Sequence, residues 1–343
     1  MTQDSTIYDI AEKAGVSAST VSRVINNYPY VNKETRAKVL KVIAESNYIK
    51  NDSARSLATQ STKMAGILIA DVRTTHHTEG VYYVEHEFSK NGYSCLIYNT
   101  GTDPDQQAKY IHLLSQRKVE AVVLMGSVFQ NVTVQNAIMV NLPNTPVAIC
   151  NGYLDGQNIY GVTSDEHGGV MNSVKLLAGK GHKNFVFITN KLTPSNQEKI
   201  NGFNDGLKLY VEGGRSDVIE VKSGEISDFE EATRQVMRSN PETDAIIYSE
   251  DFIALAGLQE DFIALAGLHA LYEMGINVPG QVAVVGMNNS RYAQISNPAL
   301  TSIDNMLYDT SLIAVRNLLE VLKGERVNHK MSIGSEVVER SST

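Results

Sequence analysis

Cysteine and long apolar runs are what this sequence most clearly lacks. Its 343 residues include two cysteines, Cys95 and Cys150, which are too few for a disulfide framework and favour a reducing compartment. No apolar run approaches the ~18 residues of a membrane span. Residues 1–5 are polar, unlike a secretory signal. We therefore expect a cytoplasmic protein without a membrane partner.

Motifs of the common catalytic and metal sites are also missing. The sequence contains neither a Gly-x-x-x-x-Gly-Lys phosphate loop nor a Gly-x-Ser-x-Gly nucleophile turn. His76 and His77 are adjacent, but no cysteine or carboxylate spacing completes a metal site. His167 lies near Asp165 in the sequence without a nucleophile to activate. We therefore predict no catalytic residue, no metal and no cofactor, and a protein that is not an enzyme.

Positive charge is scarce overall but concentrated at the start of the chain. The net charge of −8 by itself argues against nucleic-acid binding. Residues 1–60, however, contain eight Lys/Arg against six Asp/Glu, and the rest of the chain contains 22 against 32. A basic head on an acidic body is typical of a DNA-binding module joined to a part that does not bind DNA. Because the head is only mildly basic, we expect two heads to bind together.

Residues 7–26 predict two short helices joined by a tight turn. Apolar residues at helical spacing give the first helix one buried face: Ile7, Ile10, Ala11 and Ala14. Gly15 permits the turn, and Ser17 can cap the second helix. The residues left pointing outward on the second helix are Ala18, Ser19, Ser22 and Arg23. This is the helix-turn-helix arrangement, in which the second helix enters the major groove.

A third helix and a polar segment complete the first 62 residues. The helix is predicted over residues 33–46, with Tyr48 closing a small core. Residues 51–62 are polar, and Asn51 can cap a helix of about two turns, too short to be stable alone. Two interpretations stay open for this segment: a plain linker, or a helix that forms only on DNA.

From Met64 onward, short apolar runs alternate with amphipathic helical stretches. Eight such runs cover residues 65–70, 94–98, 121–125, 147–150, 185–189, 218–221, 245–248 and 282–286. The alternation predicts parallel sheets with helices on both faces, and eight runs favour two doubly wound lobes. Ligands in such folds bind beyond the carboxyl ends of the strands, often between lobes.

Taken together, these blocks resemble the lactose repressor/galactose repressor family of bacterial transcription regulators. The resemblance depends on residues 6–26, Tyr48, residues 64–69, and the pattern Asn51, Ala54, Arg55, Leu57. Later blocks agree over nearly the whole chain: residues 181–182, 201–203, 249–251, 278–279, 284–289 and 298–303. Within the family, catabolite-control and sugar-operon regulators look most similar.

The resemblance implies an α/β protein of three parts. These are a three-helix helix-turn-helix DNA-binding domain (residues 1–50), a hinge helix and linker (51–62), and a periplasmic-binding-protein-like core (63–343). The core would contain two doubly wound parallel-sheet lobes, the N-lobe from residues 63–162 and 291–323 and the C-lobe from 163–290 and 324–343. The implied function is a homodimeric, sequence-specific transcriptional regulator, a repressor of carbohydrate-related genes. Its partners would be a pseudo-palindromic operator and a small effector, a sugar or phosphosugar, in the cleft between the lobes.

The resemblance also assigns DNA contacts. Base-contacting positions fall on Ala18, Ser19 and Arg23; the guanidinium suits guanine, and the Ala18 methyl suits a thymine methyl. Phosphate-contacting positions fall on Tyr8, Ser17, Thr20 and Asn26. The hinge positions are Asn51, Ala54 and Leu57, of which Leu57 would enter the minor groove between base pairs. A phosphate contact for Arg23, and local capping or packing for the phosphate set, are the simpler alternatives.

Effector contacts are implied at eight positions: Arg73, His76, His77, Asp165, Lys199, Glu250, Asp251 and Asn288. Many relatives have two aromatic residues where His76 and His77 stand, an arginine at Lys199, and an aspartate at Asn288. The pocket is therefore expected with altered chemistry. A neutral sugar, a phosphorylated or acidic ligand, and a protein co-regulator all remain open as the controlling signal. A solute-binding protein with no regulatory role, and an enzyme on the same scaffold, are the competing function classes.

One further feature is a tandem repeat. Residues 250–259 and 260–269 are identical at nine of ten positions. Removing either copy restores the match to the family. We interpret the repeat as a recent duplication or a sequence error, with a tolerated functional insertion as the alternative.

Overall fold

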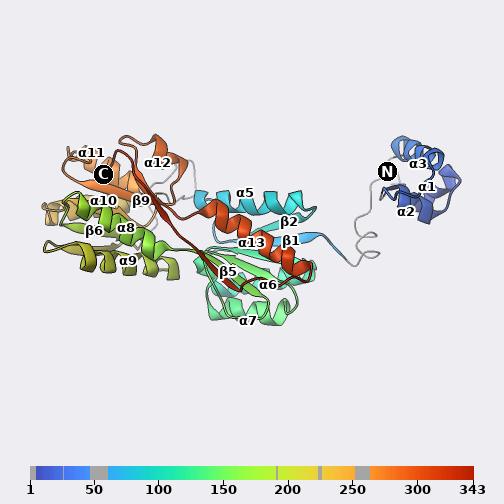
Figure 1. The fold of residues 1–343 in the computed structure, drawn as a ribbon, viewed down its shortest axis with the longest axis horizontal. Helices are drawn as coiled ribbons and strands as arrows, with labels where there is room; N and C mark the ends of the chain where they lie inside the picture. Colours follow the sequence, from blue (N-terminus) through green and yellow to red (C-terminus); the bar gives the residue numbers. More distant parts are fainter. Residues whose placement is uncertain (1–4, 26, 47–60, 191, 223–225, 252–262) are drawn as a thin grey trace. The chain divides into compact units, whose positions relative to one another are not determined.

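The computed structural model describes residues 5–343 except positions 26, 47–60, 191, 223–225 and 252–262. The chain divides into two compact units, Met1–Thr62 and Lys63–Thr343 (Figure 1). Several predicted features lie outside the described residues: Asn26, Tyr48, the hinge residues Asn51, Ala54 and Leu57, and residues 252–262 of the repeat. No described helix combines the length and apolar character that crossing a membrane requires.

The first unit contains the three predicted helices, α1 (Ile7–Ala14), α2 (Ala18–Ile25) and α3 (Lys33–Glu45). Its core consists of buried apolar side chains from all three: Ile10, Ala11, Ala14, Val21, Val24 and Val39. Gly15 adopts the left-handed region (φ +63°), so the turn needs a residue without a side chain. Ser17 Oγ accepts a hydrogen bond from Thr20 N at 3.2 Å, which confirms the predicted cap.

The N-terminus of α1 has a capping box that orders the start of the head. Thr6 Oγ1 accepts from Asp9 N at 3.3 Å, and the Asp9 carboxylate accepts from Thr6 N at 2.7 Å. These bonds, chiefly the backbone bond from Thr6, lower the pKa of Asp9 below its ordinary value. The loop before α3 is tied back by Arg36 Nη1, which donates to Asn27 Oδ1 at 2.6 Å.

The first sheet of the second unit contains six parallel strands in the order β11-β5-β4-β3-β1-β2. They are β1 (Met64–Ile69), β2 (Ser94–Asn99), β3 (Ala121–Met125), β4 (Val147–Cys150), β5 (Ile159–Ser164) and β11 (Lys330–Ile333). Helices α5 (Thr75–Lys90) and α13 (Leu307–Leu322) cover one face, and α6 (Pro104–Gln116) and α7 (Val132–Asn141) cover the other (Figure 1). The short helix η1 (Ser127–Phe129) follows β3.

The alternation of side chains along β1 shows why this strand needs both helical layers. Ile67 and Ile69 pack with Phe88 of α5 and Leu318 of α13, whereas Leu68 packs into the opposite cluster. Because both faces of the strand are buried, the run is apolar at every position instead of alternating. This explains why continuous apolar runs predicted the central strands.

The second sheet has the order β12-β10-β9-β8-β6-β7, parallel except for β12. Its strands are β6 (Phe185–Thr189), β7 (Ser216–Glu220), β8 (Ala245–Tyr248), β9 (Ala283–Met287), β10 (Thr301–Asp304) and β12 (Glu336–Val338). Helices α8 (Glu166–Gly179) and α9 (Pro194–Tyr210) pack on one face. Helices α10 (Ile226–Ser239) and α11 (Ile263–Glu273) pack on the other, and α12 (Arg291–Ile295) follows β9.

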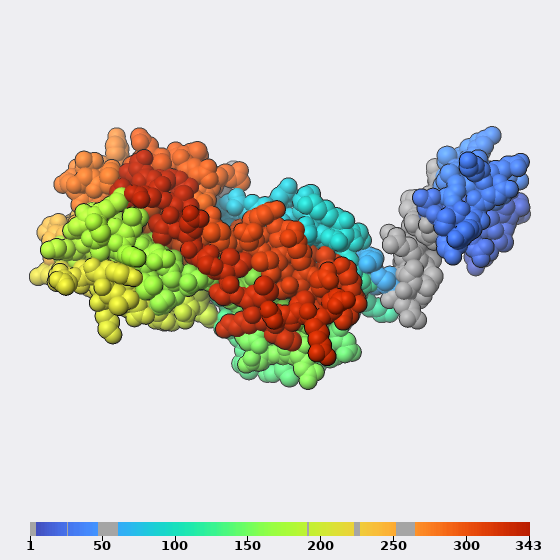
Figure 2. All heavy atoms as spheres, in the orientation of Figure 1, coloured from blue at the N-terminus to red at the C-terminus, as the bar shows by residue number. Residues whose placement is uncertain are grey.

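The lobe boundaries differ from those predicted. Strand β10, expected in the N-lobe, pairs with β9 in the second sheet, with Thr301 opposite Val285. Strand β11, expected in the C-lobe, pairs with β5 in the first, with Lys330 opposite Gly161. The chain therefore changes lobe at position 165, at 305–306 and again at 334–335. Figure 2 shows the resulting C-terminal segment lying across both lobes.

The described part of the second repeat copy forms most of α11. Ala266, Leu268 and Leu271 of this helix are buried against the second sheet. At the surface, Arg234 of α10 joins the two helices by pairing with Glu230 at 3.0 Å and Glu273 at 2.6 Å. His269 and the two glutamates have metal-ligand spacing, but Arg234 already neutralises the carboxylates. We therefore assign this cluster to helix packing.

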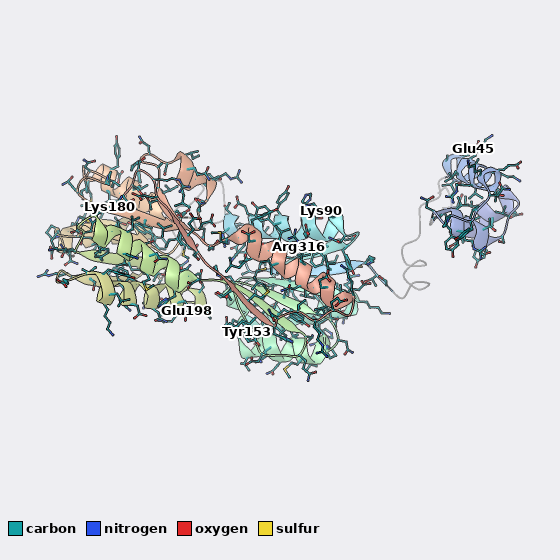
Figure 3. The ribbon with its side chains drawn as sticks, in the orientation of Figure 1. Glu45, Lys90, Tyr153, Lys180, Glu198 and Arg316 are labelled. Atoms are coloured by element: carbon teal, nitrogen blue, oxygen red, sulfur yellow. The ribbon has the colours of Figure 1, made fainter. Side chains whose placement is uncertain are left out.

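Ion pairs also join the two helices on one face of the first sheet. Arg316 of α13 and Lys90 of α5 flank Glu87, at 3.2 Å and 3.7 Å from its carboxylate (Figure 3). The two basic side chains are largely exposed, so each pair contributes little to stability. The apolar contacts beneath them determine how α5 and α13 pack.

Close packing of α8 on α9 depends on Gly202. A Cβ atom at this position would lie 2.1 Å from the backbone oxygen of His167. We predict that Gly202→Ala lowers the free energy of unfolding by about 1–3 kcal/mol, because α9 must move outward. Gly179→Ala is the matched control: no atom lies within 4 Å of its Cβ position, and helix propensity favours alanine by about 0.5–1 kcal/mol. Urea unfolding of both variants checks this, and equal stabilities would contradict it.

Candidate functional site

The exposed face of α2 carries most of the described residues that the sequence predicts to contact DNA. Ser19 and Arg23 are exposed, and Ala18 and Thr20 lie half-buried beside them. Among the described residues, the Arg23 guanidinium forms no ion pair, so it is available to a ligand. Tyr8 of α1 is 74% exposed and therefore also accessible.

Ser17 lies in a small hydroxyl cluster at the start of α2. Its Oγ is 2.8 Å from Ser19 Oγ and 2.9 Å from Thr20 Oγ1. Backbone amides at a helix N-terminus and nearby hydroxyls can both donate to a phosphate oxygen. The local capping that we considered as an alternative for Ser17 and Thr20 is therefore present. It leaves both hydroxyls on the exposed side of the helix start.

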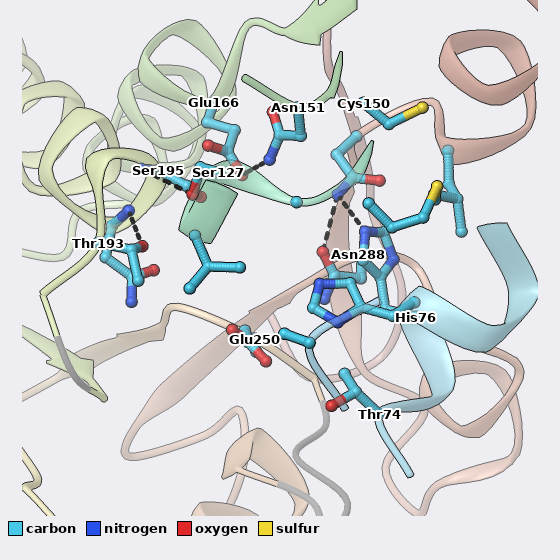
Figure 4. A pocket seen from close by; sticks show the side chains of 18 of the residues that line it. Thr74, His76, Ser127, Cys150, Asn151, Glu166, Thr193, Ser195, Glu250 and Asn288 are labelled. Atoms are coloured by element: carbon cyan, nitrogen blue, oxygen red, sulfur yellow. Dashed lines mark hydrogen bonds between the residues drawn. The ribbon is translucent and has the colours of Figure 1, made fainter. Parts of the chain in front are cut away.

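A cavity of about 250 Å³ lies within the second unit where the carboxyl ends of the two sheets meet (Figure 4). The first sheet contributes residues that directly follow strands, such as Gly126 after β3 and Asn151 after β4. The second contributes Asn190, Glu250 and Asn288, which follow β6, β8 and β9 within two residues. Because all these strands end at facing edges, residues distant in sequence converge.

His76 and His77 line this cavity from the first turn of α5. Burial, with a smaller contribution from the positive charge of Lys199, lowers the pKa of His76 to about 3 and of His77 to about 4. Both rings are therefore neutral at pH 7. His76 Nε2 accepts from Asn305 Nδ2 at 3.2 Å, so the proton of this neutral ring lies on Nδ1.

Asn305 connects the two lobes across the cavity. Besides His76, its Nδ2 donates to Asn288 Oδ1 at 2.9 Å. Asn305 lies in the second of the three crossings between lobes, and Asn288 follows β9 in the left-handed region (φ +92°). Figure 4 shows this hydrogen-bond chain from His76 to Asn288. It links a side chain from each lobe through one amide.

Lys199 of α9 is the buried cation of the cavity. Its Nζ donates to Asn196 Oδ1 at 3.2 Å and to the backbone oxygen of Ser249 at 3.1 Å. It also lies 3.5 Å from Glu166 Oε1, and the two side chains are only 4% and 5% exposed. Asn151 Nδ2 donates to the same Glu166 oxygen at 3.1 Å. The ammonium thus has two hydrogen-bond acceptors and one carboxylate partner within the protein.

Glu250 is the second carboxylate of the cavity wall. Enclosure in the protein raises its pKa to about 7, an effect that Lys199 partly opposes and Glu166 reinforces. Within the described residues, Glu250 has no Lys, Arg or His within ion-pair distance. The negative charge of Glu166 is therefore paired with an ammonium, whereas that of Glu250 is not.

Three residues predicted to contact the effector lie elsewhere. Arg73 is exposed and pairs with Asp71 at 2.6 Å. Asp165 caps α8 by accepting from Gly168 N at 2.8 Å. Asp251 is fully buried beneath the cavity and accepts hydrogen bonds from Ser290 N and Ser302 Oγ, both at 2.8 Å. Each of these charged groups has a hydrogen-bond or ion-pair partner nearby, and none of the three residues lines the cavity.

The structure adds cavity residues that we did not predict. Among them are five polar residues with amide or carboxylate side chains: Asn151, Glu166, Asn190, Asn196 and Asn305. Asn151 and Asn190 immediately follow the apolar runs 147–150 and 185–189. A polar residue directly after a buried strand is the signal that could have identified them, since such positions lie at the carboxyl edge of the sheet.

Known proteins match the two units separately and together. Residues 6–51 match the model of bacterial regulatory proteins, lacI family, and residues 174–343 match that of a periplasmic binding protein-like domain. An HTH-type transcriptional regulator of Lachnoclostridium phytofermentans is 31% identical, covering 98% of this chain and 99% of that protein. A catabolite control protein A of Priestia megaterium is 28% identical over 94% of each chain.

Solved structures share the fold over nearly the full length. A lac repressor dimer bound to operator and the anti-inducer ONPF has a TM-score of 0.85 at 22% identity, covering 99% of both chains. A complex of the regulator CelR with cellobiose has a TM-score of 0.69 at 22% identity, covering 99% of this chain and all of the other. At these identities the structural match establishes the architecture, a small helical head and two parallel-sheet lobes.

The Lys199–Glu166 pair generates a first prediction. Lys199→Met leaves a buried carboxylate without its cation and should destabilise the protein by about 3 kcal/mol. In a double-mutant cycle with Glu166→Gln, the double variant should be more stable than the sum of the single losses by at least about 1 kcal/mol. The exposed pair Lys323–Glu320, at 2.7 Å, is the control and should show coupling below about 1 kcal/mol. Additive losses at the buried pair would contradict the assignment.

Glu250 generates a prediction on pH. Because its pKa is raised to about 7, the folded protein keeps a proton that the unfolded chain has already released. Its contribution to stability therefore falls as pH rises from about 5 to 7. The buried neutral histidines act in the opposite direction, so the quantity to measure is the difference in Tm between wild type and Glu250→Gln. We expect this difference to shift in favour of the variant as pH rises. A constant difference would show that the pKa of Glu250 is ordinary.

Proposed function

The chain belongs to the lacI family of bacterial regulatory proteins and is a DNA-binding transcriptional regulator, and we propose how its two units share this function. The head binds an operator through α2, and the cavity binds a small effector that sets operator affinity. The observation that carries this proposal is the presence, in one chain, of an exposed helix-turn-helix face and a cavity between two lobes that is lined by both polar and apolar side chains.

On the DNA side, α2 enters the major groove and Arg23 contacts a base edge. A guanidinium donates two parallel hydrogen bonds to the O6 and N7 atoms of guanine, and Arg23 is exposed on α2 and unpaired within the described chain. Tyr8, Ser17 and Thr20 then contact phosphates, which fix the position of the head without specifying sequence. Ala18 and Ser19 lie on the same helix and complete the base contacts.

Two heads act together on a pseudo-palindromic operator. The head has only two more basic than acidic residues within positions 1–60, so one head alone binds weakly. A homodimer places two heads on two half-sites and raises the effective concentration of the second. The lac repressor structure that shares this fold is itself a dimer on its operator. Repression of carbohydrate-related genes fits relatives such as the ribose operon repressor of Halalkalibacterium halodurans, 27% identical over 98% of this chain and 97% of that protein.

The effector acts because the cavity has one wall from each lobe. A ligand that contacts His76 or Ser127 from one lobe and Glu250 or Asn196 from the other stabilises one relative position of the lobes. The hydrogen bonds from Asn305 to His76 and to Asn288 already connect the two lobes, and they would respond to such a ligand. A change in lobe position alters how the two heads of a dimer are presented, which couples the cavity to DNA binding. Control by a protein co-regulator alone leaves this polar cavity without a role.

The base contact is tested by Arg23→Ala. We expect operator affinity to fall about 10- to 100-fold, with relaxed preference at one position of each half-site. Lys41→Ala is the matched control, since Lys41 is an exposed cation on α3 whose ion pair among the described residues is the long one with Glu45, at 3.9 Å. Fluorescence anisotropy on an operator selected from a random library, repeated at two salt concentrations, measures both. If both variants lose affinity equally for all sequences, Arg23 is a phosphate contact.

A further inference from the structure

The cavity has a fixed pattern of charge that bears on the chemical class of its ligand. Among the described residues that line it, Lys199 is the single Lys or Arg side chain. Its ammonium donates hydrogen bonds to Asn196 and Ser249 and forms an ion pair with Glu166. An anionic ligand would have to take this ammonium from a carboxylate that is itself only 5% exposed. Leaving Glu166 buried and unpaired costs several kcal/mol.

The neighbouring histidines do not compensate. Burial keeps the pKa values of His76 and His77 at about 3 and 4, so neither ring is positively charged near neutral pH. Arg73, the other cation predicted for this site, is exposed and paired with Asp71. The described cavity therefore has no free cation to offer a phosphate or a carboxylate.

A carboxylate without a cation, by contrast, lines the cavity. Glu250 accepts a hydrogen bond from the neutral side chain of Asn190 but has no ion-pair partner among the described residues. Asn305 is 4% exposed, and its Oδ1 is buried without a hydrogen-bond partner, while its Nδ2 donates to His76 and Asn288. That oxygen has no accessible surface, so a ligand in the cavity does not reach it. Glu250, which follows β8, is the acceptor that a positively charged donor of the ligand can approach.

We propose that the effector is a polyhydroxylated molecule with a protonated amino group, an amino sugar or a similar amino polyol, whose ammonium lies against Glu250. The proposal rests on the proposed function of the cavity as an effector site. The ammonium supplies the positive charge that the second carboxylate lacks. No bond is made or broken.

Binding of matched sugar pairs to the full-length protein tests this proposal. The amines are glucosamine, galactosamine and mannosamine; each is compared with its neutral parent, its N-acetyl form and the parent's 6-phosphate. Thermal shift screens all twelve compounds at pH 7, and calorimetry gives Kd for those that bind. We expect at least one amine to bind about tenfold or more tightly than its parent, as a charge-assisted hydrogen bond in a buried site allows. The N-acetyl form should lose this advantage.

Glu250→Gln separates the charge effect from the fit of the sugar. In this variant, the Kd of the amine and the Kd of its parent should come to within about twofold of each other, because the neutral amide offers no charge to the ammonium. Glu198→Gln removes an exposed carboxylate from α9 and should retain the wild-type ratio. Binding of the parent shows that each variant is folded.

The outcomes separate this inference from the function on which it rests. If neutral sugars or sugar phosphates bind and no amine binds more tightly than its parent, the amine proposal is overturned while the effector cavity stands. If the preference for an amine persists in Glu250→Gln, the assignment to Glu250 is overturned. If none of the twelve compounds binds, the result counts against both the proposal and a sugar effector.

Discussion

The arrangement of the core depends on one constraint: the chain passes between two sheets at three points, each within two residues of a strand end. These crossings lie at Asp165, at Asn305 and Met306, and at Gly334 and Ser335. Parallel strands end at one edge, so crossings at that edge turn the carboxyl ends of both sheets toward each other. The cavity and its polar lining follow from this, and the central crossing supplies Asn305 as a link between the lobes.

Electrostatics then determines what the cavity can accept. One buried ammonium faces two carboxylates, and the geometry assigns it to Glu166. Such a pair is costly to desolvate and contributes little net stability, so we attribute its value to placement, since it fixes α9 relative to α8 and the end of β8. Glu250 remains as the group whose charge a ligand can balance. The same enclosure that raises the pKa of Glu250 makes the two histidines neutral donors or acceptors, and not cations.

Much of this fold could be predicted from the sequence, and the parts that could not have a physical explanation. Runs such as 121–125 and 185–189 are almost entirely apolar because both faces of these strands are buried. These runs therefore predicted the positions of the central strands. Strand β5 was not predicted because Gly161 and Thr163 interrupt its apolar run. Strands β11 and β12 were not predicted because they are short edge strands of mixed polarity. His76, Lys199 and Asn288, which the resemblance assigns to effector contacts, line the cavity. The resemblance missed Glu166 and Asn305, whose roles depend on tertiary contacts with residues tens to hundreds of positions away.

The central claim is that occupancy of the cavity and binding of operator are coupled through one protein. Thermodynamic linkage makes the coupling reciprocal, which allows the claim to be tested from both sides. The direct measurement is operator affinity with and without a saturating amount of the sugar that gives the largest thermal shift, together with affinity for that sugar with and without operator. The account predicts the same factor in both, about 5- to 150-fold. Tight binding of both ligands with no effect of either on the other would contradict it.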